Sequence, residues 1–101
     1  MSASGEVDAS TVETFQSHLR AGLDAATDHP AKVLIIELGA VTYFGSAGLN
    51  AVLACHERGA SDGVAVRLVA ANPEVIRPIE VTKLDTVLRP YDSVDAAVDG
   101  E

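Results

Sequence analysis

The chain has 101 residues, 48% of them hydrophobic but only 4% aromatic, which predicts a single domain over residues 1–101 with an aliphatic core. Its 15 acidic and 7 basic residues give a net charge of −8, which disfavours nucleic acid and anionic membrane surfaces as partners. One cysteine excludes a disulfide within the chain, and no signal-peptide pattern or membrane-spanning apolar run is found, so we expect a cytoplasmic protein.

An amphipathic helix is predicted over residues 9–27, after a short polar lead at residues 4–8. Apolar side chains recur there at three- and four-residue steps, which places them on one helix face: Val12, Phe15, Leu19, Leu23 and Ala26. Ser10 and Glu13 have the spacing of a capping box at the helix start. Pro30 ends this helix because proline restricts the residue before it.

A strand, a glycine-containing turn and a second helix are predicted next. Residues 32–38 are a continuous apolar run, typical of an inner strand of a parallel sheet with both faces buried. Residues 39–48 form the turn. Residues 49–59 have the pattern of a helix that ends at Gly59.

The last third of the chain continues this alternation. We expect a strand at residues 63–71, then a helix opened by Asn72 as cap and Pro73 as first helical residue, with a kink or early end at Pro78. Residues 86–91 predict a short edge strand, and Ser93 can cap a final helix at residues 94–98. The whole pattern predicts an α/β fold with a mostly parallel sheet of about four strands.

The segment Gly45-Ser46-Ala47-Gly48 lies between the first predicted strand and the helix that follows it. A serine nucleophile is disfavoured because the hydrolase elbow needs a glycine where Phe44 stands. A phosphate-binding loop is disfavoured because neither glycine pattern of that class is present. The three histidines and the one cysteine form no ligand cluster, so we expect no metal or cofactor.

Two interpretations of Ser46 are left, and they do not exclude each other. Its oxygen can cap the following helix. It can also accept a phosphate, which a helix N-terminus tolerates because of its free N–H groups and dipole. A phosphate there would add almost two negative charges to a surface and so change a protein contact without unfolding the domain.

The sequence resembles the STAS domain family, and in particular the small anti-sigma-factor antagonists of bacteria. "SGEVDAST" resembles the family's Gly-Glu-Leu-Asp-x-x-Thr entry to its first helix, and "VLIIELGAVTYFGSAGLNAVL" resembles its most characteristic block, an apolar strand followed by Asp-Ser-Ser/Ala-Gly-Leu. The resemblance covers nearly the whole chain.

The resemblance implies a partner-switching protein with no catalysis of its own. Unphosphorylated antagonist would bind an anti-sigma factor that is also a serine kinase, and phosphorylation of Ser46 would release it, with a PPM-type phosphatase as the resetting enzyme. It implies a partner-binding surface made of Asp8, Thr11, Tyr43, Phe44, Gly45, Ala47, Gly48 and Asn50. The alternative is a structural STAS subunit of a membrane transport complex, in which Ser46 is not phosphorylated.

The sequence departs from the family pattern at three points. Gly45 stands where the family has aspartate, and Lys83 stands where the family has glycine in its Thr-Gly-Leu turn. The N-terminal strand of the family is shortened or missing. We therefore expect a poorly covered sheet edge, with weak self-association through it or a poorly ordered N-terminus.

Overall fold

The computed structural model of the protein describes residues 1–100. Strands and helices alternate along the chain as β1 (Ser2–Val7), α1 (Val12–Asp28), β2 (Val33–Phe44), α2 (Ser46–Ser61), β3 (Ala65–Val69) and α3 (Pro73–Val81). A short 3-10 helix, η1 (Leu84–Thr86), and the last helix, α4 (Val94–Asp99), follow. The α/β class predicted from the alternation is confirmed.

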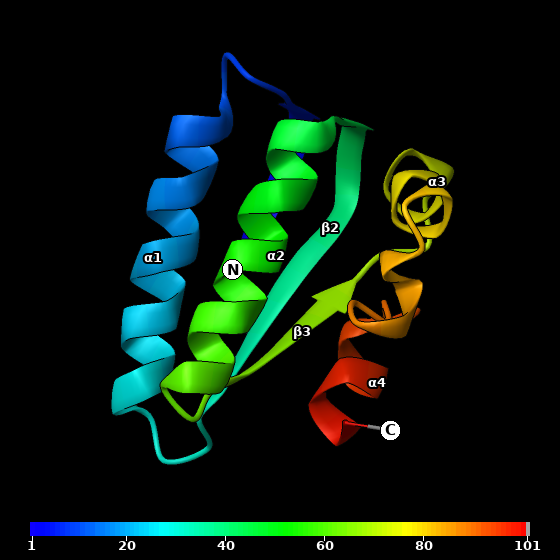
Figure 1. Cartoon of the computed structure of the whole chain (residues 1–101). Coiled ribbons are helices and arrows are strands. Elements are labelled where there is room, and N and C mark those ends of the chain that lie inside the picture. The colour runs from blue at the N-terminus through cyan, green and yellow to red at the C-terminus, as the bar shows by residue number, and fades with distance from the viewer. Residues whose placement is uncertain (101) are drawn as a thin grey trace.

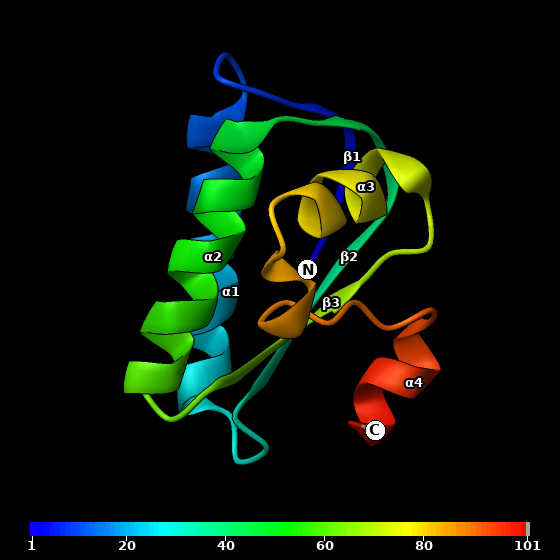
Figure 2. The same ribbon diagram turned by 45° about the vertical axis from the view of Figure 1, so that its right-hand side comes forward.

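The described residues form one parallel sheet of three strands in the order β1-β2-β3. In both ribbon views α1 and α2 lie on one side of this sheet, and α3 and α4 lie on the other (Figures 1 and 2). On β2 the side chains of Leu34, Ile36 and Leu38 are buried, whereas those of Val33 and Ile35 are only half-buried. β2 is the inner strand of a parallel sheet, as predicted. The expected continuous burial on both faces was wrong, since burial alternates along residues 33–38 and the helices on the α3 and α4 side are shorter than α1 and α2.

The N-terminal strand is present. This excludes the missing strand of the two expected alternatives, shortened or missing, and corrects the interpretation of residues 4–8 as only a polar lead. β1 pairs with β2, with Ser2 opposite Glu37 and Val7 opposite Phe44. The Glu37 N–H donates to the Met1 carbonyl at 2.9 Å. The ladder contains two register irregularities, and Gly5 has a positive φ of 75°, a conformation that glycine adopts without steric cost.

The predicted strand at residues 86–91 is absent from the structure. Leu84–Thr86 form η1 instead, and Tyr91 makes only an isolated bridge with Val69. The sheet of the described residues therefore has three strands rather than about four. The turn predicted at residues 39–48 was also too long, because β2 continues to Phe44.

Helix ends differ in detail from their sequence signals. Thr11 is the N-cap residue of α1, and the predicted capping box of Ser10 and Glu13 does not form. Asn72 is the N-cap residue of α3, but its side-chain amide donates to the carbonyls of Leu38 and Val41 at 3.1 and 2.8 Å instead of capping the helix. The α4 cap is confirmed, since the Ser93 hydroxyl oxygen accepts from the Ala96 N–H at 3.1 Å.

Candidate functional site

The candidate site lies at the carboxyl edge of the sheet, where β2 passes directly into α2 (Figure 1). Phe44 ends the strand, Gly45 has extended backbone angles, and Ser46 is the first helical residue. The Gly45 N–H donates to the Val7 carbonyl at 2.9 Å, which joins the end of β1 to the start of α2. The segments around Asp8 and Ser46 are thereby brought together from distant parts of the sequence.

Ser46 is exposed and does not cap the helix, which corrects the cap prediction. The N-cap residue is Gly45, one position earlier, and it makes no side-chain cap bond. Within residues 1–100, no hydrogen bond involves the Ser46 hydroxyl. Because the first backbone bond into α2 is from the Leu49 N–H to the Gly45 carbonyl at 3.0 Å, the amides of the preceding helical residues are left for other acceptors. The Ser46 hydroxyl, which has no hydrogen-bond partner in this part of the chain, therefore lies beside free N–H groups at the positive end of a 16-residue helix.

Tyr43 accounts for the glycine at position 45. A Cβ atom placed on Gly45 would lie 3.1 Å from Tyr43 Cε2 and 3.3 Å from its hydroxyl oxygen. The aromatic side chain thus lies against the backbone immediately before Ser46, and 53% of Tyr43 is exposed. A larger residue at position 45 requires the Tyr43 ring to move.

Phe44 and Gly48 are buried, which corrects their placement on a partner-binding surface. Phe44 is 3% exposed and packs edge-on against Phe15, with ring centroids 6.5 Å apart. A Cβ atom on Gly48 would lie 2.6 Å from a methyl carbon of Val7, so this glycine permits close packing of α2 on β1. Both residues belong to the packed interior next to Ser46 and not to the exposed surface.

Asp8 and Thr11 form a hydrogen-bonded turn between β1 and α1. The Asp8 carboxylate accepts from the hydroxyl and backbone N–H of Ser10 at 2.7 and 2.9 Å, and from the Thr11 N–H at 3.2 Å. The Thr11 hydroxyl donates to the Glu6 carbonyl at 3.0 Å and accepts from the Asp8 N–H at 3.0 Å. Hydrogen bonds from Ser10, its hydroxyl first, lower the pKa of the Asp8 carboxyl.

The other predicted surface residues lie on the first turns of α2. Asn50 is exposed and stands four positions after Ser46, so the two share one helix face. Ala47 is half-buried. Sequence reasoning missed Ser10 as the main partner of Asp8, although the spacing Asp-x-Ser/Thr is a known signal of such turns.

Within residues 1–100, no three His, Cys, Asp or Glu side chains are placed to hold a metal ion. His18 and His29 are exposed, and Cys55 is buried, with burial raising the pKa of its thiol. Over the same residues, no helix combines the length and apolar character that crossing a bilayer demands.

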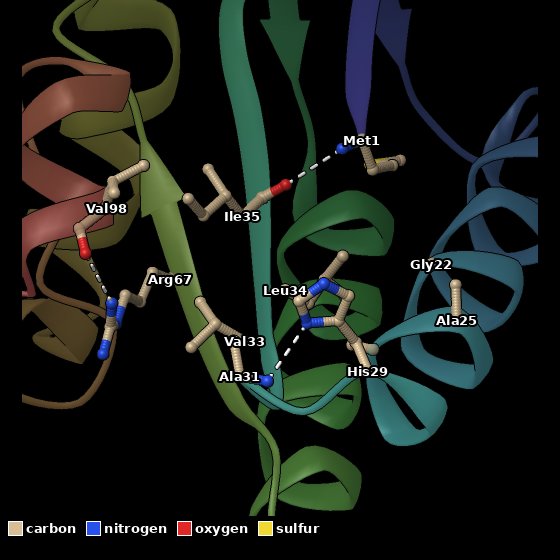
Figure 3. Close-up of a pocket in the computed structure, with 11 residues that line it drawn as sticks. Met1, Gly22, Ala25, His29, Ala31, Val33, Leu34, Ile35, Arg67 and Val98 are labelled. Atoms are coloured by element: carbon tan, nitrogen blue, oxygen red, sulfur yellow. Dashed lines mark hydrogen bonds between the residues drawn. The ribbon is translucent and has the colours of Figure 1, made fainter.

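A shallow hollow of about 500 Å³ lies beside the first half of β2 (Figure 3). Its lining is mostly apolar, and its two ionisable side chains, His29 and Arg67, already have structural partners. His29 Nδ1 accepts from the Ala31 N–H at 3.0 Å, and the Arg67 guanidinium donates to the Ala97 carbonyl at 2.8 Å. These bonds hold the α1–β2 turn and α4 in place.

Comparisons with known proteins agree with this geometry. The family model of the STAS domain matches residues 1–97. Among solved structures, the fold is similar to that of an anti-sigma factor antagonist from Mycobacterium paratuberculosis, with 30% sequence identity and a TM-score of 0.85. That match covers 98% of this chain and 80% of the mycobacterial chain. No curated protein sequence matches significantly.

Proposed function

Because the chain belongs to the STAS domain family, we propose that it is an anti-sigma-factor antagonist controlled by phosphorylation of Ser46. The mycobacterial protein whose structure matches 98% of this chain is an anti-sigma factor antagonist. In this proposal the unphosphorylated protein binds an anti-sigma factor of the serine-kinase type and thereby frees a sigma factor for transcription. The protein itself has no catalytic role, and the whole chain acts as one domain.

The observation that carries the proposal is the state of the Ser46 hydroxyl. It is exposed, it stands at the first position of α2, and it has no hydrogen bond within the described residues. A kinase can therefore reach it without breaking a native contact. The cap interpretation offered no such argument, since a capping hydroxyl is engaged by the backbone.

The same position explains how a phosphate would act as a switch. The free N–H groups and the positive end of the α2 dipole stabilise an anion at this place, so the domain stays folded. Two added negative charges change the surface that Tyr43, Gly45, Ala47 and Asn50 present to a partner. A partner surface that fits Ser46 as an uncharged hydroxyl is no longer complementary once a phosphate adds this charge and volume.

Asp8 and Thr11 stand next to this surface, because the Val7 carbonyl accepts the Gly45 N–H. We assign the turn that they form to the rim of the partner-binding surface. Its hydrogen bonds fix the rim in one conformation, which reduces the entropy lost on binding. A PPM-type phosphatase would remove the phosphate and reset the protein.

The test is incubation of the purified protein with candidate anti-sigma kinases and ATP, followed by intact-mass measurement and peptide mapping. We expect one added phosphate on wild type and none on Ser46→Ala. Phosphate on another residue, with Ser46→Ala modified as fully as wild type, contradicts the assignment. A protein that binds no such kinase and copurifies with a membrane transporter instead favours the structural-subunit alternative.

A further inference from the structure

A groove of about 550 Å³ lies between the end of β2 and α3. Tyr43, Pro73, Arg77, Pro78 and Val81 are among its lining residues. Its rim carries two of the most exposed large apolar side chains of the described residues, Val81 at 74% and Tyr43 at 53%. Exposed apolar side chains around a concave surface are typical of a protein-binding site.

Tyr43 joins this groove to the phosphorylation site. Its ring lines the groove and at the same time lies against Gly45, the residue before Ser46. A protein side chain that enters the groove and contacts this ring therefore contacts a residue that also lies against Gly45, next to Ser46 in the chain. The groove and the start of α2 meet at Tyr43, near the carboxyl end of β2.

The charged side chains of the groove indicate which charged group of a partner would bind beside its apolar side chain. Glu74 and Arg77 both line it. Glu74 belongs to the first turn of α3, where the helix dipole stabilises a carboxylate. Arg77 is exposed and has no ion pair within residues 1–100, so it is the charge available for a partner.

We propose that this groove is the anchor site for the anti-sigma partner, which inserts one apolar side chain between Tyr43 and Val81 and places a carboxylate against Arg77. The inference rests on the proposed function, since the same partner must reach Ser46. It adds that recognition extends from α2 across Tyr43 to α3. Affinity in such surfaces is concentrated in a central apolar anchor with a charged rim.

The experiment compares Val81→Lys with Val98→Lys, using the anti-sigma kinase that phosphorylates wild type in the preceding test. Val98 is a matched control because it is 60% exposed and lies on α4, which does not line the groove. We expect Val81→Lys to weaken kinase binding at least tenfold and to raise the KM for Ser46 phosphorylation. Val98→Lys should bind within twofold of wild type, and both variants should melt within about 2 °C of it, because exposed substitutions cost little stability.

Arg77→Glu tests the charged part of the proposal. Its expected effect is a further loss of affinity that shrinks as ionic strength rises, since salt screens the pair with the partner's carboxylate. Equal affinities of Val81→Lys, Val98→Lys and wild type overturn the inference while leaving Ser46 phosphorylation intact. If Val81→Lys instead abolishes self-association of the chain and leaves kinase affinity unchanged, the groove receives a second copy and the inference is also overturned.

Discussion

Ser46 was expected to act as a helix cap, as a phosphorylation site or as both, and in the structure it does not cap α2. Because its hydroxyl makes no hydrogen bond within the described residues, replacement by alanine removes no cap. We expect Ser46→Ala to change the free energy of unfolding by less than about 0.5 kcal/mol, since alanine is also the better helix former. Urea denaturation measures this, and a loss near the usual 1 kcal/mol of a missing cap contradicts the geometry.

The same substitution should also fix the protein in its binding state. Ser46→Asp should keep the fold, since a carboxylate in a first helical turn is favoured by the dipole. It should weaken kinase binding only partly, because it carries less charge than a phosphate. Titration of the kinase against wild type, Ser46→Ala and Ser46→Asp ranks the three affinities, and a mimic that binds as tightly as wild type speaks against a charge-based switch.

Asp8 gives the folded protein a pH dependence at acid pH. The hydrogen bonds from Ser10 lower the folded pKa of its carboxyl below the ordinary value of 3.8. Its stabilising contribution is therefore fully present above that ordinary value and is lost as the pH falls through the lower, folded pKa. Asp8→Asn keeps an acceptor oxygen but cannot titrate, so this part of the acid destabilisation should disappear.

Unfolding of wild type and Asp8→Asn at pH 7 and at pH 3 measures that difference. We expect the two proteins to converge in stability at the acid end. If the gap between them stays constant over this range, the carboxylate is not held by Ser10 in solution. A phosphorylation rate that falls in Asp8→Asn at pH 7, under conditions in which both proteins are fully folded, would place the turn in the partner-binding surface.

At the scale of elements, the turn from α3 to η1 depends on one strained residue. Lys83 has a φ of 61°, in the left-handed region, and its N–H donates to the Glu80 carbonyl at 3.0 Å. A side chain there costs about 1 kcal/mol relative to glycine. The turn keeps a glycine-like conformation although the sequence has lysine.

We therefore expect Lys83→Gly to stabilise the protein by roughly 0.5–1 kcal/mol, after the greater flexibility of glycine in the unfolded chain is subtracted. Lys83→Ala is the control, because it removes the same charge and keeps the strain. Thermal unfolding of the three proteins decides the point. Equal melting temperatures for the glycine and alanine variants contradict a strained Lys83.

Elements differ in how far the sequence predicts them, for reasons that particular residues make clear. The apolar stripe of α1 is repeated over four turns, and Phe15, Leu19, Leu23 and Ala26 are buried as predicted. β1 escaped prediction because Ser2–Gly5 are small residues with little strand preference, and its conformation comes from pairing with β2. Such tertiary pairing is invisible to a local pattern.

The cap of α2 was predicted one residue too late, at Ser46 instead of Gly45, and this difference decides whether the Ser46 hydroxyl is engaged by the backbone. The strand-to-helix change was expected near Ser46, but a capping position and a first helical position have similar sequence signals. Only the backbone angles of Gly45 place the cap one residue earlier. The contact of Tyr43 with Gly45 joins residues two positions apart through a side-chain conformation that no sequence pattern encodes.

For the whole molecule, the free edge of β1 and the negative charge act against each other. β1 forms the outer strand of the sheet, and an open strand edge favours pairing with another chain. Two copies that each carry a charge of −8 repel one another. We expect weak self-association that increases with salt, because salt screens the repulsion.

Sedimentation velocity at two ionic strengths measures this association. Ser4→Lys is the informative variant, since Ser4 is exposed in the middle of β1 and lysine on an edge strand discourages pairing. The variant should stay monomeric where wild type associates. Association that is insensitive both to salt and to Ser4→Lys occurs elsewhere on the molecule.

Because Cys55 is buried, chemical labelling of its thiol can measure local opening between α1 and α2. This single thiol is 8% exposed and lies on α2, near its seam with α1, and its raised pKa keeps it protonated at neutral pH. A thiol-specific label therefore reacts more slowly than with an exposed cysteine, at a rate that follows the fraction of molecules in which the seam between these helices is open. Ser46 and Cys55 lie on the same helix, α2. A labelling rate that changes when a partner or a phosphate is added would show that binding or phosphorylation at the start of α2 alters the opening of the helix near Cys55.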